Sequence, residues 1–202
     1  MSAGTKMGRM EGSRDTARLV LLNGPPAAGK STVAAALLEE FGHEGRLAVL
    51  EHDAFAEMGG AHLAAGARAT DIWATGLEAL VAAAKTYLGA GMSVLVVVNY
   101  GVERKSLLDN MLAPYEPRHV VILPPWRTNR GRVLSRVAAG QPPRRLGDIS
   151  EEAHRQFHAD LTAMARNGEF DDVIASPRIR LETIARRVAR HLGLIERGHI
   201  AT

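Results

Sequence analysis

Short apolar runs recur along the chain, each bounded by polar residues, glycine or proline. Leu19–Leu22 leads directly into Asn23 and Gly24, and Ser93–Val98 is apolar after its first residue. A bounded apolar run of this length is typical of a strand that is buried on both faces. The pattern predicts five strands, at Arg18–Asn23, Arg46–Glu51, Ser93–Val98, His119–Leu123 and Asp172–Ala175.

Helical patterns separate these strands. In Thr70–Leu88, Leu77, Leu80 and Val81 recur at helical spacing and give the segment one apolar face. Strands that alternate with helices predict an α/β fold with a parallel sheet covered on both faces, whose ligands bind at the carboxyl ends of the strands. The expected helices are Gly29–Phe41, a short helix with a mobile turn in Ala54–Ala67, Thr70–Leu88, Glu103–Leu112, Thr128–Ala138, Ser150–Arg166 and Arg180–Leu192.

The first strand leads into a match to the phosphate-loop motif G-x-x-x-x-G-K-[ST], completed by Gly24, Gly29, Lys30 and Ser31. The glycines allow a tight turn, and inward N–H groups with the following helix form an anion nest. Lys30 is expected to reach the β- and γ-phosphates, and the Ser31 hydroxyl to ligate Mg²⁺. A chance match in a glycine- and alanine-rich chain is the alternative, but the flanking strand and helix favour binding of a nucleoside triphosphate. Pro25 and Pro26 have no N–H, so the donors to the phosphates are expected from Ala27, Ala28, Gly29, Lys30, Ser31 and Thr32.

Composition narrows the remaining classes. The chain has 202 residues, of which 46% are hydrophobic and 23% charged, and it has no cysteine. Disulfides, a thiol nucleophile and cysteine zinc sites are therefore excluded. No apolar run approaches the ~20 residues of a membrane span, and the N-terminus lacks a secretory pattern, so we expect a cytoplasmic protein with no membrane partner. A net charge of +3 is too small to argue for nucleic-acid binding by itself.

The early phosphate loop in a short chain, with an arginine-rich segment after the fourth strand, resembles the small P-loop kinases. Gluconate kinase, shikimate kinase and chloramphenicol phosphotransferase are the most similar in layout, over roughly Arg18 to Leu192. The resemblance implies a three-layer P-loop NTPase fold with sheet order 2-3-1-4-5 and phosphoryl transfer from ATP to a small molecule's hydroxyl. It divides the chain into a disordered tail at 1–17, a kinase domain at 18–193 with a lid at about 128–150, and a tail at 194–202.

Asp53 follows the second strand, where these kinases place an acidic residue that faces the acceptor. It is expected to accept the hydroxyl proton or to hold the Mg²⁺ shell. The alternative is an N-cap for a helix that starts at Ala54, which would stabilise the helix by ~1 kcal/mol. Its position at the binding edge of the sheet favours catalysis.

The third strand ends at Asn99, where many P-loop proteins carry an aspartate that holds Mg²⁺ through water. An amide cannot supply that charge, which argues against a fast ATPase motor but is compatible with a small kinase of the gluconate-kinase type. Asn99, Tyr100 and Arg104 then become candidates for holding the acceptor, although packing is an equal alternative for Tyr100.

Arginines gather after the fourth strand, and in the small kinases this region is a lid that closes on the phosphates. Arg132 and Arg136 are spaced i, i+4 and share a helix face, so they are the candidates for stabilising charge during transfer. A solvated basic helix is the alternative. Arg178, after the last strand, is a positional candidate for the adenine. The cluster consists of Arg127, Arg130, Arg132 and Arg136 on or beside the helix and Arg144 and Arg145 in the next loop.

His154 and His158 are also spaced i, i+4, but they lack the glutamate of an H-E-x-x-H metal motif, so we interpret them as surface residues. Trp73 and Trp126 are expected to pack. The sequence therefore favours an Mg-ATP-dependent kinase acting on an antibiotic, another secondary metabolite, a sugar acid or a nucleoside. A nucleotide or polynucleotide 5′-hydroxyl kinase and an ATP-binding regulatory ATPase remain as alternatives. The oligomeric state stays open.

Overall fold

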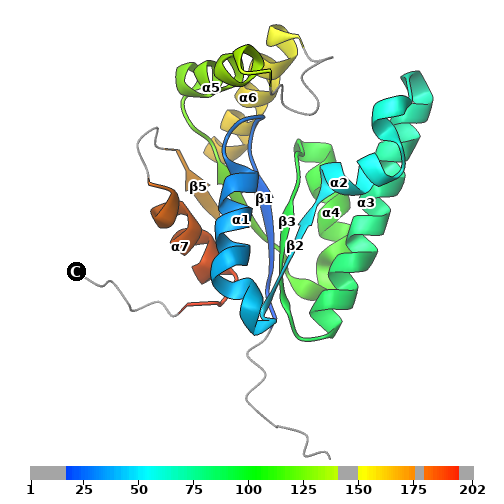
Figure 1. Ribbon diagram of the computed structural model, residues 1–202, viewed down its shortest axis with the longest axis vertical. Helices are drawn as coiled ribbons and strands as arrows, with labels where there is room; N and C mark the ends of the chain where they lie inside the picture. Colours follow the sequence, from blue (N-terminus) through cyan, green and yellow to red (C-terminus); the bar gives the residue numbers. More distant parts are fainter. Residues whose placement is uncertain (1–16, 141–149, 176–179, 196–202) are drawn as a thin grey trace, which may run out of the picture.

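The computed structural model describes residues 17–140, 150–175 and 180–195. Its centre is a five-stranded sheet in the order β2-β3-β1-β4-β5, in which every pair of neighbours is parallel. Figure 1 shows this sheet between two layers of helices. The three-layer α/β fold and the strand order expected from the resemblance are confirmed. The strands are β1 (Leu19–Asn23), β2 (Leu47–Glu51), β3 (Ser93–Val97), β4 (Arg118–Ile122) and β5 (Asp172–Ile174).

All five residues of β1 are buried, and its four apolar residues alternate between two hydrophobic clusters. Val20 and Leu22 belong to the cluster under α1 (Lys30–Phe41) and α7 (Leu181–His191). Leu19 and Leu21 belong to the one under α3 (Gly66–Gly89), α4 (Val102–Leu112) and α6 (Glu151–Arg166). Both faces of a parallel strand are covered in this way, which explains the apolar run in the sequence. The helices are α1 (Lys30–Phe41), α2 (His52–Met58), α3 (Gly66–Gly89), α4 (Val102–Leu112), α5 (Trp126–Ala138), α6 (Glu151–Arg166) and α7 (Leu181–His191).

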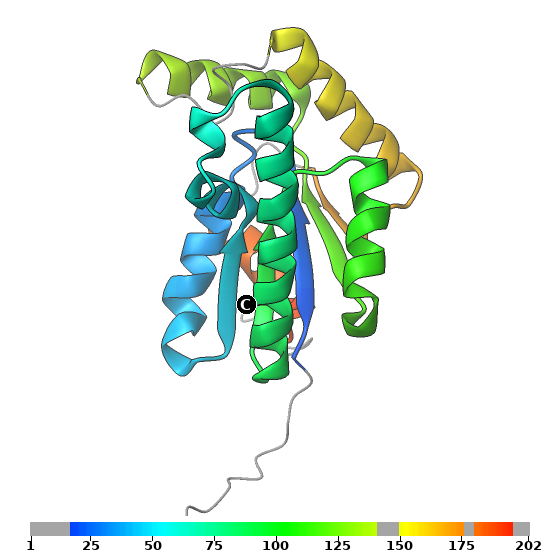
Figure 2. The ribbon, with the colours of Figure 1, turned by 90° about the vertical axis from the view of Figure 1, so that its right-hand side faces the viewer.

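The register aligns the carboxyl ends of the central strands. Leu22 of β1 pairs with Val97 of β3, and Asn23 pairs with Val121 of β4. Figure 2 shows α5 and the start of α6 lying across this end of the sheet. The loops that follow β1, β3 and β4 therefore meet beneath two helices, at the edge where ligands bind in such folds.

Three helix starts differ from the sequence prediction by two residues or more. The second helix starts at His52 rather than Ala54, and α5 starts at Trp126 rather than Thr128. The long helix α3 starts at Gly66, four residues before the expected Thr70, so the expected mobile turn shrinks to a 3₁₀ turn at Ala61–Leu63 and its flanks. Several predictions lie outside the described residues: the tails at 1–16 and 196–202, Arg144 and Arg145 of the lid, and Arg178.

Candidate active site

The phosphate loop joins β1 to α1 and has the backbone that an anion nest requires. Gly24 has φ +152° and Gly29 has φ +106°, and Ala27 between them also has a positive φ of +59°. A Cβ on Gly24 would lie 2.5 Å from the backbone oxygen of Ile122 in β4, so glycine is required there by space as well as by conformation. The loop thus passes close under β4 on its way to α1.

The first turn of α1 is open to an anion. Gly29 is the N-cap, no side chain caps the helix, and no acidic residue occupies its first turn. Ser31 and Thr32 are exposed at this end. Uncapped N–H groups at the positive end of a helix are a ready-made phosphate site. The predicted cradle, Gly24–Thr32, therefore fits the phosphates of a nucleotide.

Lys30 is buried within the loop it belongs to. Its Nζ donates to the backbone oxygens of Gly24 at 2.7 Å and Pro25 at 3.2 Å. Burial lowers the pKa of Lys30 to about 8, although the charges of Asp53 and Glu51 act to raise it. The ammonium of Lys30 is thus held within the phosphate loop, close enough to Asp53 and Glu51 to interact with their charges.

Asp53 lies in the first turn of α2, immediately after β2. The N-cap is Glu51, and its side chain makes no capping hydrogen bond. The alternative role for Asp53, as the N-cap of a helix starting at Ala54, is therefore wrong, because the helix has already begun at His52. His52 is buried, and its Nε2 lies 3.0 Å from the backbone oxygen of Trp73, which fixes α2 against α3.

Asn23 links the phosphate loop to the end of β3, and the sequence analysis missed it. The side chain is fully buried. Its Oδ1 accepts from the backbone N–H of Gly24 at 2.8 Å and of Tyr100 at 3.3 Å, while its Nδ2 donates to the Tyr100 backbone oxygen at 2.9 Å. A polar residue that ends a buried strand was the available signal.

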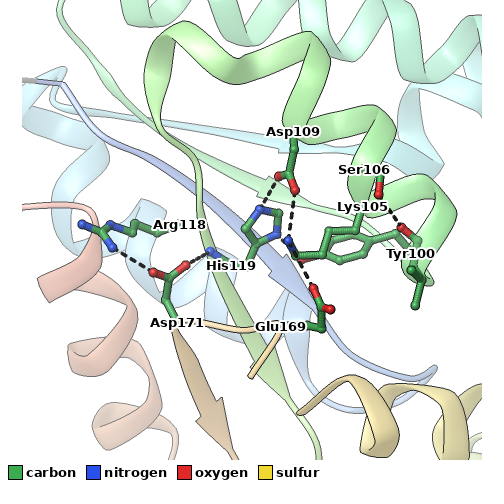
Figure 3. Close-up of polar contacts among 9 residues, drawn as sticks. Tyr100, Lys105, Ser106, Asp109, Arg118, His119, Glu169 and Asp171 are labelled. Carbon is green, nitrogen blue, oxygen red and sulfur yellow. Dashed lines mark hydrogen bonds and ion pairs between the residues drawn. The ribbon is translucent and has the colours of Figure 1, made fainter. Parts of the chain in front are cut away.

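Tyr100 is 1% exposed; it is one of the residues that line the cavity described below, but its hydroxyl points into the fold toward His119. Its hydroxyl lies 2.7 Å from His119 Nδ1, and His119 Nε2 lies 2.6 Å from an oxygen of Asp109 (Figure 3). Burial raises the pKa of Tyr100 well above its usual value and lowers that of His119. A neutral His119 that accepts from Tyr100 and donates to Asp109 satisfies all three groups, so packing is the role that this geometry supports for the tyrosine side chain.

Asn99 and Arg104 lie beside a cavity of about 720 Å³. In the described part of the chain, Asn99 Oδ1 is the one buried side-chain polar atom without a hydrogen-bond partner. Arg104 Nη1 donates to the Asn99 backbone oxygen at 3.0 Å. The cavity lies between the segment after β3 and one side of α6, and Pro26 of the phosphate loop forms part of its wall.

The helices α5 and α6 are fastened to the phosphate loop by Asn129, which is fully buried. Its Nδ2 donates to the Pro26 backbone oxygen at 2.7 Å, and its Oδ1 lies 2.8 Å from His154 Nε2. The prediction that His154 and His158 are surface residues is wrong: both are buried, and His158 Nε2 lies 2.8 Å from the Pro124 backbone oxygen. Burial also lowers the pKa of His154, so it is neutral near pH 7.

Arg132 and Arg136, the two arginines predicted to act on the phosphates, lie near the phosphate loop. Arg132 Nη1 donates to the Ala28 backbone oxygen at 3.3 Å. Arg136 lies one turn further along α5, and its positive charge also acts to lower the pKa of Lys30. Arg130, by contrast, forms an exposed ion pair with Glu151 at 2.7 Å.

Comparison with known proteins identifies the family to which the chain belongs. A family model described as an AAA domain matches residues 19–164. The chain belongs to this P-loop family. The match includes the phosphate loop, Asp53, the segment after β3 and most of α6. No match was found among the curated proteins.

Solved structures of kinases share the fold. APS kinase CysC of Mycobacterium tuberculosis, solved with AMPPNP and APS, has 20% identity and a TM-score of 0.59, and the match covers 88% of this chain and 98% of that one. Shikimate kinase of Acinetobacter baumannii, solved with shikimate, has 15% identity and a TM-score of 0.60, covering 87% and 93%. A chain of the Pnkp1/Rnl/Hen1 RNA repair complex has 15% identity and a TM-score of 0.62, covering 79% of this chain and 49% of that one.

The chain therefore has a kinase-like P-loop fold, as the sequence resemblance predicted. No helix in the described part of the chain is long and apolar enough to cross a membrane.

Proposed function

We propose that this protein is an Mg-ATP-dependent kinase that transfers the γ-phosphate to a hydroxyl group of a small molecule. One observation carries this proposal: Pro26 of the phosphate loop is also part of the wall of the large cavity. A nucleotide on the loop and an acceptor in the cavity would therefore lie next to one another, as transfer requires.

The donor side would use the loop itself. Its N–H groups and Lys30 hold the phosphates, while Arg132 and Arg136 stabilise charge on the transferred group. Ser31 and Asp53 are the oxygen ligands available to Mg²⁺, which when bound neutralises charge on the phosphates. Arg178 stays a proposed adenine contact outside the described residues.

Asp53 is not one of the residues that line the cavity, so it would take the proton of an acceptor hydroxyl that extends out of the cavity toward the γ-phosphate. The hydroxyl oxygen forms a bond to the γ-phosphorus as the bond from that phosphorus to the bridging oxygen breaks, and ADP leaves. Asn99 and Arg104 line the acceptor cavity. Tyr100 would contribute through its backbone position rather than through its hydroxyl, which is bonded to His119.

The test is release of ADP from Mg-ATP against a panel of hydroxylated small molecules, nucleosides and 5′-hydroxyl oligonucleotides. We expect release that depends on a small-molecule acceptor and that falls by at least ~100-fold in Asp53→Asn, with a much smaller change in ATP affinity. The matched control is Glu78→Gln, an exposed position in α3.

Other outcomes point to other functions. Salt-sensitive release with the oligonucleotides alone would identify a polynucleotide kinase. Slow release that no acceptor accelerates would identify a regulatory ATPase. Full activity in Asp53→Asn would remove the proposed proton acceptor.

A further inference from the structure

The residues that line the cavity beside the phosphate loop indicate which kind of acceptor it can bind. Unlike the anion-binding loop, they are mostly apolar and include two carboxylates. One wall is the segment that follows β3, from Asn99 to Arg104. The other is a single side of α6, on which Ala153, Phe157, Asp160 and Met164 recur three or four residues apart. A cavity of about 720 Å³ is within the range that accommodates drug-sized ligands.

The walls are largely apolar. Phe157 and Met164 of α6, Val102 at the start of α4 and Pro26 of the phosphate loop are the large apolar residues that line the cavity. An acceptor that fills this space must bury an apolar body of aromatic or branched aliphatic type, because bare polar groups would lose hydration against these side chains.

The charges on the walls have a negative balance. Glu103 and Asp160 supply two carboxylates, and neither forms an ion pair with a described residue; Asp160 accepts a hydrogen bond from Gln156 at 2.8 Å. Among the described residues that line the cavity, Arg104 is the single cation, and its Nη1 donates to the Asn99 backbone oxygen. His154 adds no charge near pH 7 because burial lowers its pKa. Glu103 and Arg104 offset one another on the wall after β3, whereas Asp160 leaves the α6 wall with a net negative charge, where an anionic acceptor would meet like charge and an amine opposite charge.

We propose that the cavity selects an uncharged or amine-bearing hydroxyl compound with an apolar body and rejects carboxylic acids and phosphorylated compounds. This inference rests on the proposed function only for the transfer step, because the charge selection is a property of binding. It favours secondary metabolites of the antibiotic kind over sugar acids and nucleic-acid ends.

The effect of ligand charge on binding is tested with three compounds of similar shape that carry a positive, a neutral and a negative group: 4-(hydroxymethyl)benzylamine, 4-(hydroxymethyl)benzamide and 4-(hydroxymethyl)benzoate. Their affinities for the full chain with Mg-ADP are measured by ligand-observed saturation-transfer NMR. We expect the amine to bind at least ~10-fold more tightly than the carboxylate, with the amide between them. In the double variant Glu103→Gln, Asp160→Asn the gap should shrink to about twofold, while Glu78→Gln in α3 leaves it unchanged.

Phe157→Ala should weaken all three probes alike, since it removes apolar contact and no charge. A carboxylate that binds as tightly as the amine, a gap that survives the double variant, or binding by none of the probes would each overturn the proposal. The ADP-release assay separates this inference from the function. Selective binding without release removes the kinase and keeps the charge selection, whereas release with an acidic acceptor removes the selection and keeps the kinase.

Discussion

The phosphate loop and the acceptor cavity lie side by side, but the chain builds them in opposite ways. The loop is nine consecutive residues, Gly24–Thr32, whose shape is set by backbone conformation at Gly24 and Gly29. The cavity is assembled from the segment after β3 and from α6, which lie about fifty residues apart in the sequence. The loop is chemically specified by a local motif, whereas the cavity depends on how distant elements pack.

Two buried asparagines hold the regions together. Asn23 joins the loop to the end of β3, and Asn129 joins it to α6 through His154. Each uses both its amide donor and its amide oxygen, which is what fixes the orientation of a buried amide. Substitutions in the loop, in these links and in the cavity wall should therefore have separable effects.

The largest effect is expected from Lys30→Ala. Removal of the ammonium should reduce turnover by at least ~1,000-fold, because no other side chain of the loop can place a positive charge among the phosphates. Thermal unfolding should stay cooperative, since burial already disfavours the charged form of this lysine. Steady-state kinetics and calorimetry measure both.

Lys85→Ala is the control, because this lysine is exposed on α3. If Lys30→Ala kept its turnover, the phosphate-loop assignment would be wrong.

The same contrast explains what the sequence could predict. The loop, the alternation of strands and helices and the strand-end position of Asp53 depend on local pattern, and all were found. The 2-3-1-4-5 order came from the resemblance, because periodicity does not determine which strands are neighbours. Start positions such as His52 for α2 were missed by two residues because no side chain caps that helix.

The cavity wall shows where local pattern fails. His154 and His158 were assigned to the surface because two polar rings on a helix carry no sign of what will cover them. A signal was present in that His158 and Leu161 are three residues apart on α6, and both turn out to be buried. Asn129 gave no signal, since it lies among exposed arginines and its partners are the Pro26 backbone and His154.

The second largest effect is expected from Asn129→Ala, which breaks the link between the two regions. It leaves the Pro26 oxygen without its amide donor and His154 Nε2 without its partner, so the free energy of unfolding should fall by about 2–3 kcal/mol. ATP and acceptor should also lose the mutual effect that each has on the other's affinity. Denaturant unfolding and paired titrations are the measurements.

Asn110→Ala, at an exposed position of α4, provides the comparison. Equal losses in the two variants would show that Asn129 is not a link.

A smaller effect, on stability but not on ATP affinity, is expected from Tyr100→Phe. The change removes the donor to His119 Nδ1 within the fold and should cost about 1 kcal/mol of unfolding free energy. The backbone of residue 100 remains held by Asn23, so ATP affinity should be unchanged. Tyr87→Phe, which alters an exposed tyrosine, should change stability by less than ~0.5 kcal/mol. A large loss of ATP affinity in Tyr100→Phe would show that the tyrosine hydroxyl supports the phosphate loop as well as the core.

The smallest effect concerns the protonation of Lys30. Burial lowers its pKa to about 8, so the free protein carries the ammonium below that pH and loses it progressively above. Phosphates favour the charged amine, so ATP binding at about pH 9 should take up close to one proton, whereas binding near pH 7 should take up almost none from this group. ATP affinity should fall by less than ~10-fold from pH 8 to 9 for the same reason. Calorimetric titrations in two buffers of different ionisation enthalpy measure the uptake, and Lys30→Arg, which stays protonated, should abolish it. Proton uptake that persists in Lys30→Arg would show that another group takes up the proton. The positive charge at the phosphate loop would then have to be attributed to Arg132 and Arg136.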